Sequence, residues 1–317
     1  MSYSFAVVSL PALDLRSRPA HTAELGSQLL LGEIVRLGVA RKGWRHVTNL
    51  ADGYRGWVRE WGLVPASDRR VRAWRRKARA SVVAPLAMLS AGPRGGVGAG
   101  PVFFGSRAIP GRRSRGRIEL ELPDARRGWV DRSAVALPGD ARPALAQRIT
   151  SLLGSPYLWG GRTPAGYDCS AFVQQALLEQ DVRLPRDAAQ QLSACRRLDR
   201  GEEPVPGDLA FFAGRSGRIE HVGILFAPTL FVHSRGRVQF ASLSPDNPLY
   251  DKELSVQLAA WGRPQLGAGN CRPDAPGAFP PLTARGGVHN VPRGRVPGSF
   301  RQEGFGRVFP SRLHHRE

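Results

Sequence analysis

The sequence predicts a multidomain protein in which one or two small all-β barrels precede an α+β domain with an antiparallel sheet. Two observations carry this prediction. Up to residue 137, short apolar runs alternate with turn residues at the spacing of a small β-barrel. From residue 140 onward, amphipathic helical patterns come first and strand-like runs follow, which is the order expected of an α+β domain. The 317 residues leave room for two or three domains.

Residues 1–65 form the first predicted barrel. Its strands are expected in the runs FAVVSL, LLLGEIVRLGVA, WRHVTNL and GWVREWGLV. Turns are expected at Arg16-Ser17-Arg18-Pro19 and at Asp52-Gly53, because these residue types favour tight turns. The phrases LDLRSRP, GEIVRL, KGWRHV and DGYRGWV resemble those of a bacterial SH3-like barrel. In that family, repeated Gly-Trp pairs mark the strands that cross the barrel wall.

Residues 66–79 are an arginine-rich linker in which we expect a short helix. Residues 80–139 are predicted to form a second, degenerate SH3-like barrel. The sequence Arg127-Gly128-Trp129-Val130 repeats Arg55-Gly56-Trp57-Val58 of the first barrel. Strands are expected in SVVAPLAML, PVFFGSRAI, RIELEL and RGWVDRSAVAL, and the segment GPRGGVGAGP is typical of a glycine-rich loop.

Residues 140–263 are the predicted α+β domain. Helices are expected in ALAQRITSLLG, from Cys169 to about Gln180, and in AAQQLSACRRL. Strands are expected in DLAFFAG, HVGILFAP, LFVHSRG and VQFASL. Residues 264–317 are rich in glycine, proline and arginine without sustained periodicity, which predicts a disordered tail.

The net charge of +20 comes almost entirely from arginine, since Lys42, Lys77 and Lys252 are the only lysines. No helix-turn-helix, zinc-finger or aromatic RNA-binding motif accompanies this charge, so no nucleic-acid partner is expected. Arginine clusters at 69–79 and 107–117 leave an anionic partner open, although solvated loop and linker charge is favoured. No apolar run reaches the roughly 20 residues of a membrane span, so no membrane association is expected.

The beginning of the chain lacks the basic, apolar and small-residue segments of a secretory signal. This predicts a cytoplasmic protein, with a secreted or periplasmic one as the alternative. Cys169, Cys195 and Cys271 are spaced neither as a disulfide framework nor as a zinc site, and they fit a reducing compartment. We assign no role to Cys195 or Cys271.

Cys169 is the candidate nucleophile. It follows an aromatic-glycine segment and opens a predicted helix, where the helix dipole is expected to lower the pKa of its thiol. His221 and His233 lie on consecutive predicted strands joined by a tight connection, so we expect them side by side facing the helix. A thiol nucleophile needs a general base and a residue that orients this base, and His221 and His233 can fill these two roles. There are three alternatives: a cysteine without reactivity, histidines that only form hydrogen bonds within the sheet, or an open zinc site made by all three residues.

The motifs YLWGG, YDCSAFVQ, LPRDAAQQ, PGDLAFF, HVGILF and FVHS resemble, in order and spacing, those of the NlpC-type cell-wall endopeptidases. These are papain-like cysteine peptidases that cut peptidoglycan stem peptides. The resemblance covers residues 145–245 and implies Cys169 as nucleophile, His221 as base and His233 as the orienting residue. It implies no cofactor, no metal and no obligate protein partner. The Cys169 backbone N–H, at the helix start, is a candidate oxyanion donor, and Tyr157 is a candidate second polar contact.

Family members with SH3-like barrels and no signal resemble murein-peptide recycling enzymes, which cleave the γ-D-glutamyl bond to a diamino acid in peptides with a free N-terminal L-Ala. This resemblance implies an amine pocket with Asp168 and Ser170 beside the nucleophile and Tyr54 in the barrel. Glu24 is a further candidate for a barrel carboxylate. A carboxylate pair suits an ammonium group, because a buried charge needs a partner.

Arg186 is a candidate contact for the carboxylates of the substrate. One departure from the family pattern follows it: Ala188 stands where relatives usually have serine, which puts the fine specificity in doubt. Two rival functions remain open at this point. One is a secreted hydrolase or amidase that acts on the intact cell wall, and the other is a non-catalytic protein that binds cell wall or anions.

Overall fold

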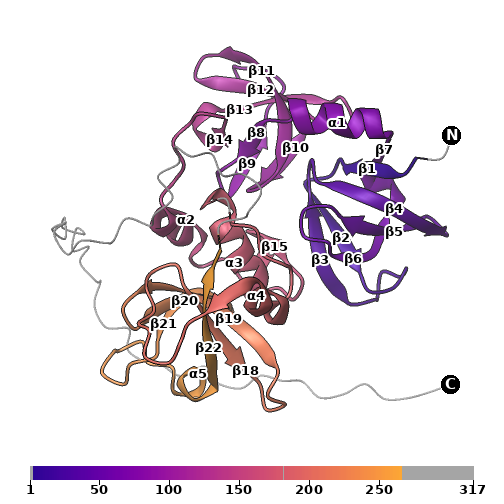
Figure 1. Ribbon diagram of the computed structural model, residues 1–317. Helices are drawn as coiled ribbons and strands as arrows, with labels where there is room; N and C mark the ends of the chain where they lie inside the picture. The colour runs from indigo at the N-terminus through magenta and orange to yellow at the C-terminus, as the bar shows by residue number, and fades with distance from the viewer. Residues whose placement is uncertain (1–2, 181, 266–317) are drawn as a thin grey trace, which may run out of the picture. The chain divides into compact units, whose positions relative to one another are not determined.

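The computed structural model describes residues 3–180 and 182–265 (Figure 1). The predicted tail lies outside the described residues from position 266 onward, and so does Cys271. Within the described residues, no helix is long and apolar enough to cross a membrane.

The first barrel is an antiparallel seven-stranded sheet in the order β3-β2-β6-β5-β4-β1-β7. Its strands are β1 (Phe5–Val8), β2 (Ala12–Arg16), β3 (Leu25–Leu30), β4 (Ile34–Arg41), β5 (Trp44–Asn49), β6 (Arg55–Arg59) and β7 (Leu63–Ala66). Aliphatic side chains, among them Val8, Leu15 and Val47, fill its interior. The predicted SH3-like β region is therefore confirmed.

The run LLLGEIVRLGVA contains the end of β3 and most of β4, and the turn between the two strands lies at Gly32. Gly32 has a φ of +85°, which side-chain-bearing residues rarely adopt, and a Cβ there would lie 2.2 Å from the Arg107 carbonyl oxygen. Only glycine therefore allows the second barrel to approach this turn so closely.

The arginine-rich linker contains the expected helix, α1 (Asp68–Lys77). Ser67 caps it by accepting a hydrogen bond from the Arg70 N–H, and basic residues occupy its last turn, where the helix dipole favours positive charge. Its apolar face packs beside β1 and β7, and the Trp74 indole donates to the Gly32 carbonyl at 2.9 Å. Amphipathic packing thus accounts for the helix despite its charge.

The second barrel combines a five-stranded sheet in the order β13-β12-β11-β8-β14 with a β9–β10 hairpin. Its strands are β8 (Ala80–Val82), β9 (Leu86–Leu89), β10 (Gly100–Phe103), β11 (Arg107–Ser114), β12 (Arg117–Glu121), β13 (Arg127–Asp131) and β14 (Val135–Ala136). Its own core holds Val82, Leu120 and Val130. All four predicted strand runs contribute to it.

The C-terminal part of the described chain combines helices with a six-stranded antiparallel sheet in the order β17-β22-β18-β19-β20-β21. Its helices are α2 (Leu145–Leu152), α3 (Cys169–Leu177), α4 (Ala188–Ala194) and α5 (Lys252–Gln257). Its strands are β15 (Arg162–Thr163), β16 (Gly166–Tyr167), β17 (Cys195–Arg197), β18 (Leu209–Ala213), β19 (Ile219–Ala227), β20 (Leu230–Arg235), β21 (Arg237–Ser242) and β22 (Leu258–Pro264). Helix α3 is buried along its whole length and packs on β19 and β20 (Figure 1). The predicted α+β architecture is confirmed.

One helix prediction ran too far. Cys195 was expected within a polar helix, but α4 ends at Ala194 and Cys195 is the first residue of β17, paired with Pro264. The pairing partner of Cys195 lies 69 residues downstream, so no local sequence pattern predicts this strand. Helix α5 and strand β22 were not predicted.

Candidate active site

Asp168 places Cys169 at the start of α3. Its carboxylate caps the helix by accepting from the Ala171 N–H at 2.8 Å, and it also accepts from the Gly160 N–H at 3.0 Å. The cap and the glycine loop ahead of it therefore hold Cys169, the candidate nucleophile, in place. Within the described residues, the Cys169 backbone N–H has no acceptor, which is the state that an oxyanion donor requires.

The thiol pKa is shifted in the direction opposite to the prediction. Burial raises the pKa of Cys169 to about 11, and the neighbouring Asp168 carboxylate adds to the increase. Hydrogen bonds from the backbone N–H groups of Val222 and Ser170 act the other way without cancelling it. The expectation of a lowered pKa was wrong because the side chain, 8% exposed, loses more solvation than the helix start restores.

His221 and His233 lie together as predicted. The His221 Nε2 and His233 Nδ1 atoms are 2.8 Å apart, and the two residues come from the neighbouring strands β19 and β20. Because Nε2 of His221 is engaged, its Nδ1 is the nitrogen left to act on a thiol. The contact between the rings also argues against the zinc alternative, since those two nitrogens face each other and cannot both bind a metal ion.

Both imidazoles are held in the neutral form. Burial, followed by the charges of His233 and Arg235, lowers the pKa of His221 to about 3. Burial likewise lowers the pKa of His233 to about 4, although the Asp251 carboxylate opposes the shift. A neutral His221 can accept a proton, so the site at rest pairs a neutral thiol with a neutral base.

These pKa shifts predict how alkylation of Cys169 depends on pH. Because a thiol with a pKa near 11 gains thiolate tenfold per pH unit below that value, the iodoacetamide rate constant should rise about tenfold per unit from pH 7 to pH 10. Mass spectrometry of the Cys169 peptide in a Cys195→Ala background measures it. A constant rate between pH 6 and pH 9 would instead indicate a preformed thiolate–imidazolium pair.

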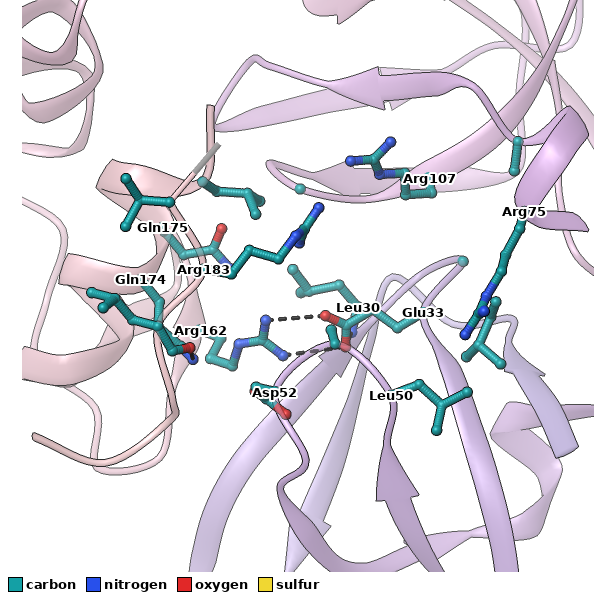
Figure 2. A pocket seen from close by; sticks show the side chains of 18 of the residues that line it. Leu30, Glu33, Leu50, Asp52, Arg75, Arg107, Arg162, Gln174, Gln175 and Arg183 are labelled. Atoms are coloured by element: carbon teal, nitrogen blue, oxygen red, sulfur yellow. Dashed lines mark hydrogen bonds and ion pairs between the residues drawn. The ribbon is translucent and has the colours of Figure 1, made fainter. Parts of the chain in front are cut away.

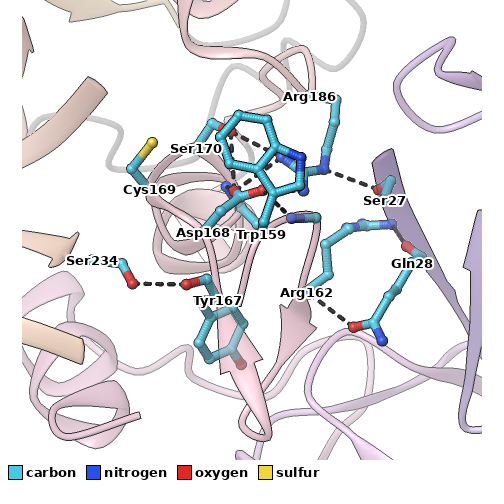
Figure 3. Close-up of polar contacts among 12 residues, drawn as sticks. Ser27, Gln28, Trp159, Arg162, Tyr167, Asp168, Cys169, Ser170, Arg186 and Ser234 are labelled. Atoms are coloured by element: carbon cyan, nitrogen blue, oxygen red, sulfur yellow. Dashed lines mark hydrogen bonds and ion pairs between the residues drawn. The ribbon is translucent and has the colours of Figure 1, made fainter. Parts of the chain in front are cut away.

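Arg186 does not face the substrate, contrary to prediction. It is 1% exposed, and its guanidinium donates to both carboxylate oxygens of Asp168 and to the Ser170 hydroxyl (Figure 3). Its Nε donates to the Ser27 hydroxyl of the first barrel at 2.9 Å. Arg186 therefore stabilises the helix start and ties it to β3. Asp168 and Ser170 are the neighbours of Cys169 in the chain, and their role in substrate binding stays a prediction.

The first barrel brings Tyr54 and Glu24 to the same region. Burial raises the pKa of Tyr54, and the negative charges of Asp187, Asp168 and Glu24 raise it further, against the effect of Arg186. The Glu24 carboxylate accepts from the Trp159 indole at 2.9 Å. The barrel thus contributes a hydroxyl and a carboxylate beside the aromatic-glycine loop.

Asp187 is a further member of this group that was not singled out as a binding residue. It is half-buried, and among residues 3–180 and 182–265 its carboxylate has no hydrogen-bond partner. Burial raises its pKa, with Arg186 opposing and Asp168 adding to the shift. The sequence signal that could have identified Asp187 as a binding residue was its position directly after Arg186, which was itself a candidate.

Tyr157, in the loop before α3, lies near enough to Cys169 to be affected by its charge. Burial, then the Cys169 and Asp168 charges, raises the pKa of its hydroxyl to about 12, so it remains a hydrogen-bond donor. It lines a pocket of about 300 Å³ together with His221, Glu220 and Arg235. Its part in catalysis stays a prediction.

Arg162 joins the first barrel to the loop before α3, which nothing in the local sequence indicated. Its guanidinium donates to the Gln28 carbonyl at 2.7 Å (Figure 3). The same guanidinium forms an ion pair with Glu33 at 3.0 Å. Its backbone N–H donates to the Gln28 side chain. With the Arg186–Ser27 bond, these contacts attach strand β3 to the site.

Comparison with known proteins agrees with this geometry. The NlpC/P60 family profile matches residues 154–257, and that of the bacterial dipeptidyl-peptidase SH3 domain matches residues 15–63. The chain is 37% identical over 112 residues to the probable endopeptidase NlpC of Escherichia coli K12, a match that covers 35% of this chain and 72% of that protein. It is 32% identical over 130 residues to the γ-D-glutamyl-L-lysine dipeptidyl-peptidase of Bacillus subtilis, covering 39% and 44%. Dipeptidyl-peptidase 6 of Lysinibacillus sphaericus is also 32% identical, over 132 residues, covering 38% and 44%, so the match spans less than half of these last two relatives.

Solved structures show the same fold over most of the chain. The structure of an NlpC/P60 family protein from Bacillus cereus superposes with a TM-score of 0.69 at 20% identity, covering 82% of this chain and 99% of that one. An NlpC/P60 endopeptidase from Photobacterium damselae gives a TM-score of 0.61 at 15% identity, covering 83% and 70%. From the match to the Escherichia coli protein together with the fold, we conclude that the chain belongs to the NlpC/P60 family of cysteine peptidases.

Proposed function

We propose that this protein hydrolyses the γ-D-glutamyl bond to the diamino acid in free murein peptides that begin with L-Ala. The observation that carries the proposal is the group of Tyr54, Glu24 and Asp187 beside the capped start of α3. Two of these residues come from the first barrel, so the barrel closes one end of the site. A recycling role would go with a cytoplasmic location.

In the proposed reaction, the Cys169 thiol gives its proton to Nδ1 of His221 while sulfur attacks the amide carbonyl. The carbonyl oxygen becomes an oxyanion, to which the Cys169 backbone N–H donates. When the C–N bond breaks, His221 returns the proton to the leaving amine of the diamino acid, and a thioester remains. His221 then takes a proton from water, hydroxide attacks the thioester carbonyl, and the thiol is regenerated.

The amine pocket follows from the charges. Asp187 has a carboxylate without a partner, and Glu24 keeps one oxygen beyond its bond with Trp159. An ammonium group would pair with these carboxylates and with the Tyr54 hydroxyl, whereas an acylated nitrogen would leave them desolvated and unpaired. Peptides still attached to glycan carry such an acyl group, so the pocket would select free peptides.

Two substrates test the proposal: L-Ala-γ-D-Glu-diaminopimelate and its N-acetylated form. Because a polar group that loses its hydrogen-bond partner on binding costs about 1–3 kcal/mol, we expect kcat/KM for the acetylated peptide to be about 10- to 100-fold lower. Asp187→Asn should lower kcat/KM for the free peptide about tenfold and change little for the acetylated one. Product release is quantified by chromatography.

The control is Asp199→Asn, which changes an exposed aspartate outside the site and should leave both values unaltered. Cys169→Ala reports background hydrolysis. Equal cleavage of the two peptides would exclude the amine pocket. The protein would then be a peptidase of this family that does not require a free amino group. Cleavage of neither peptide would contradict the recycling function.

A further inference from the structure

A second cavity lies away from the cysteine, between the two barrels and helix α3. Its volume is about 430 Å³, within the range of ligand pockets. Cys169, His221 and His233 do not line it. Its walls come from β3, β4, α1, α3 and the segments around residues 51, 105 and 183 (Figure 2).

The charge of the lining is positive. Its charged side chains are four arginines and two carboxylates, namely Arg75, Arg107, Arg162, Arg183, Glu33 and Asp52, a net of two positive charges. Glu33 is paired with Arg162 at 3.0 Å. Within the part of the chain that the structure describes, the side chains of Arg75 and Arg183 form no hydrogen bond or ion pair. Two exposed guanidinium groups therefore face this cavity with their donors available.

The cavity also holds buried polar atoms that the rest of the described chain does not satisfy. Gln175 is 1% exposed, and neither its Oε1 nor its Nε2 has a partner. Gln174 donates from Nε2 to the Leu184 carbonyl at 2.9 Å, but its Oε1 has none. Asp52 Oδ2 and Arg162 Nε are likewise unpaired. A buried donor or acceptor that lacks a hydrogen bond costs about 1–3 kcal/mol. A cluster of such atoms around one cavity therefore points to a bound group that supplies the missing hydrogen bonds.

We propose that this cavity binds a small polyanion, a compound with at least two negative charges on phosphate or carboxylate groups and with hydroxyl or amine donors. Arg75 and Arg183 would hold the anionic groups, since guanidinium donors match planar and tetrahedral oxyanions. Asp52 and the Oε1 atoms of Gln174 and Gln175 would accept from the donors of the ligand, and the Gln175 Nε2 would donate to its anionic groups. The site is separate from the peptidase site and does not rest on the proposed substrate.

The binding test uses inorganic pyrophosphate and citrate, titrated into the whole protein by calorimetry in 0.15 M salt, where weak surface binding is screened. We expect saturable one-to-one binding of at least one probe and a Tm that rises with probe concentration. Comparison of the two probes tells a phosphate site from a carboxylate site. A concentration of about 10 mM lies above the Kd of most specific sites. Absence of saturable binding by both probes up to that concentration would overturn the proposal.

Matched variants locate the binding. Arg75→Gln/Arg183→Gln should weaken it at least about tenfold, the loss typical of charge-assisted hydrogen bonds. Arg72→Gln/Arg76→Gln changes the net charge equally, at exposed positions of α1 that do not line the cavity, and should leave the affinity within about twofold. Equal weakening by both pairs would show non-specific attraction and overturn the site.

Gln175→Leu tests the buried end of the cavity without altering charge. It removes two unpaired polar atoms, so the Tm of the free protein should not fall, while the probe affinity should drop about tenfold. An unchanged affinity in a folded Gln175→Leu variant would contradict the role of this residue. Peptidase activity is not needed for any of these readouts.

Discussion

Cys169→Ala is expected to lower kcat at least about 10⁴-fold, as removal of a catalytic nucleophile does in other hydrolases. The remaining groups, His221 and the free backbone N–H of residue 169, cannot form the thioester. The fold should persist, because an alanine methyl occupies the space of the buried Cβ and α3 keeps its Asp168 cap. The measurement is kcat with the free tripeptide, together with a thermal unfolding curve.

Cys195→Ala is the matched control for that substitution. Cys195 is half-buried in β17, an edge strand that β22 and β18 separate from the strands of His221 and His233, so kcat should stay within about twofold. Hydrolysis by the Cys169→Ala variant at a rate close to that of the unaltered protein would remove Cys169 from the mechanism.

Arg186→Leu is expected to destabilise the protein by about 3–5 kcal/mol, the usual cost of leaving one member of a buried ion pair alone. Arg186 is 1% exposed and binds Asp168 through two nitrogens, at 3.0 Å for Nη1–Oδ1. Its loss would leave the Asp168 carboxylate buried without its cation next to Cys169 and would remove the hydrogen bond to Ser27. Urea unfolding with linear extrapolation gives the free energy.

Arg183→Leu, three residues earlier, makes the same substitution at an exposed side chain and should change stability by no more than about 0.5 kcal/mol. The Asp168→Asn/Arg186→Leu double variant should be less destabilised than the sum of the single changes, because neither charge is left alone. A loss below about 1 kcal/mol for Arg186→Leu would mean that the pair does not support the helix start.

Much of the fold was predictable because its signals are local. Gly-Trp pairs and turn residues predicted the barrels. Helical periodicity predicted a helix that begins at Cys169, which is the first residue of α3. His221 and His233 were placed together because two strands joined by a connection as short as Pro228-Thr229 must be neighbours. Helix α5 and strand β22 were missed, since one is six residues long and the other pairs with strands distant in sequence.

The sequence by itself determined which side chains are the candidates for the chemistry and on which elements they stand. Only the tertiary structure decided their environment. Arg186, expected to face the substrate, is enclosed because strand β3, 159 residues earlier, covers it with Ser27. The Cys169 pKa rises because burial outweighs the helix start. Desolvation and long-range pairing depend on the whole packed chain, and no local pattern contains them.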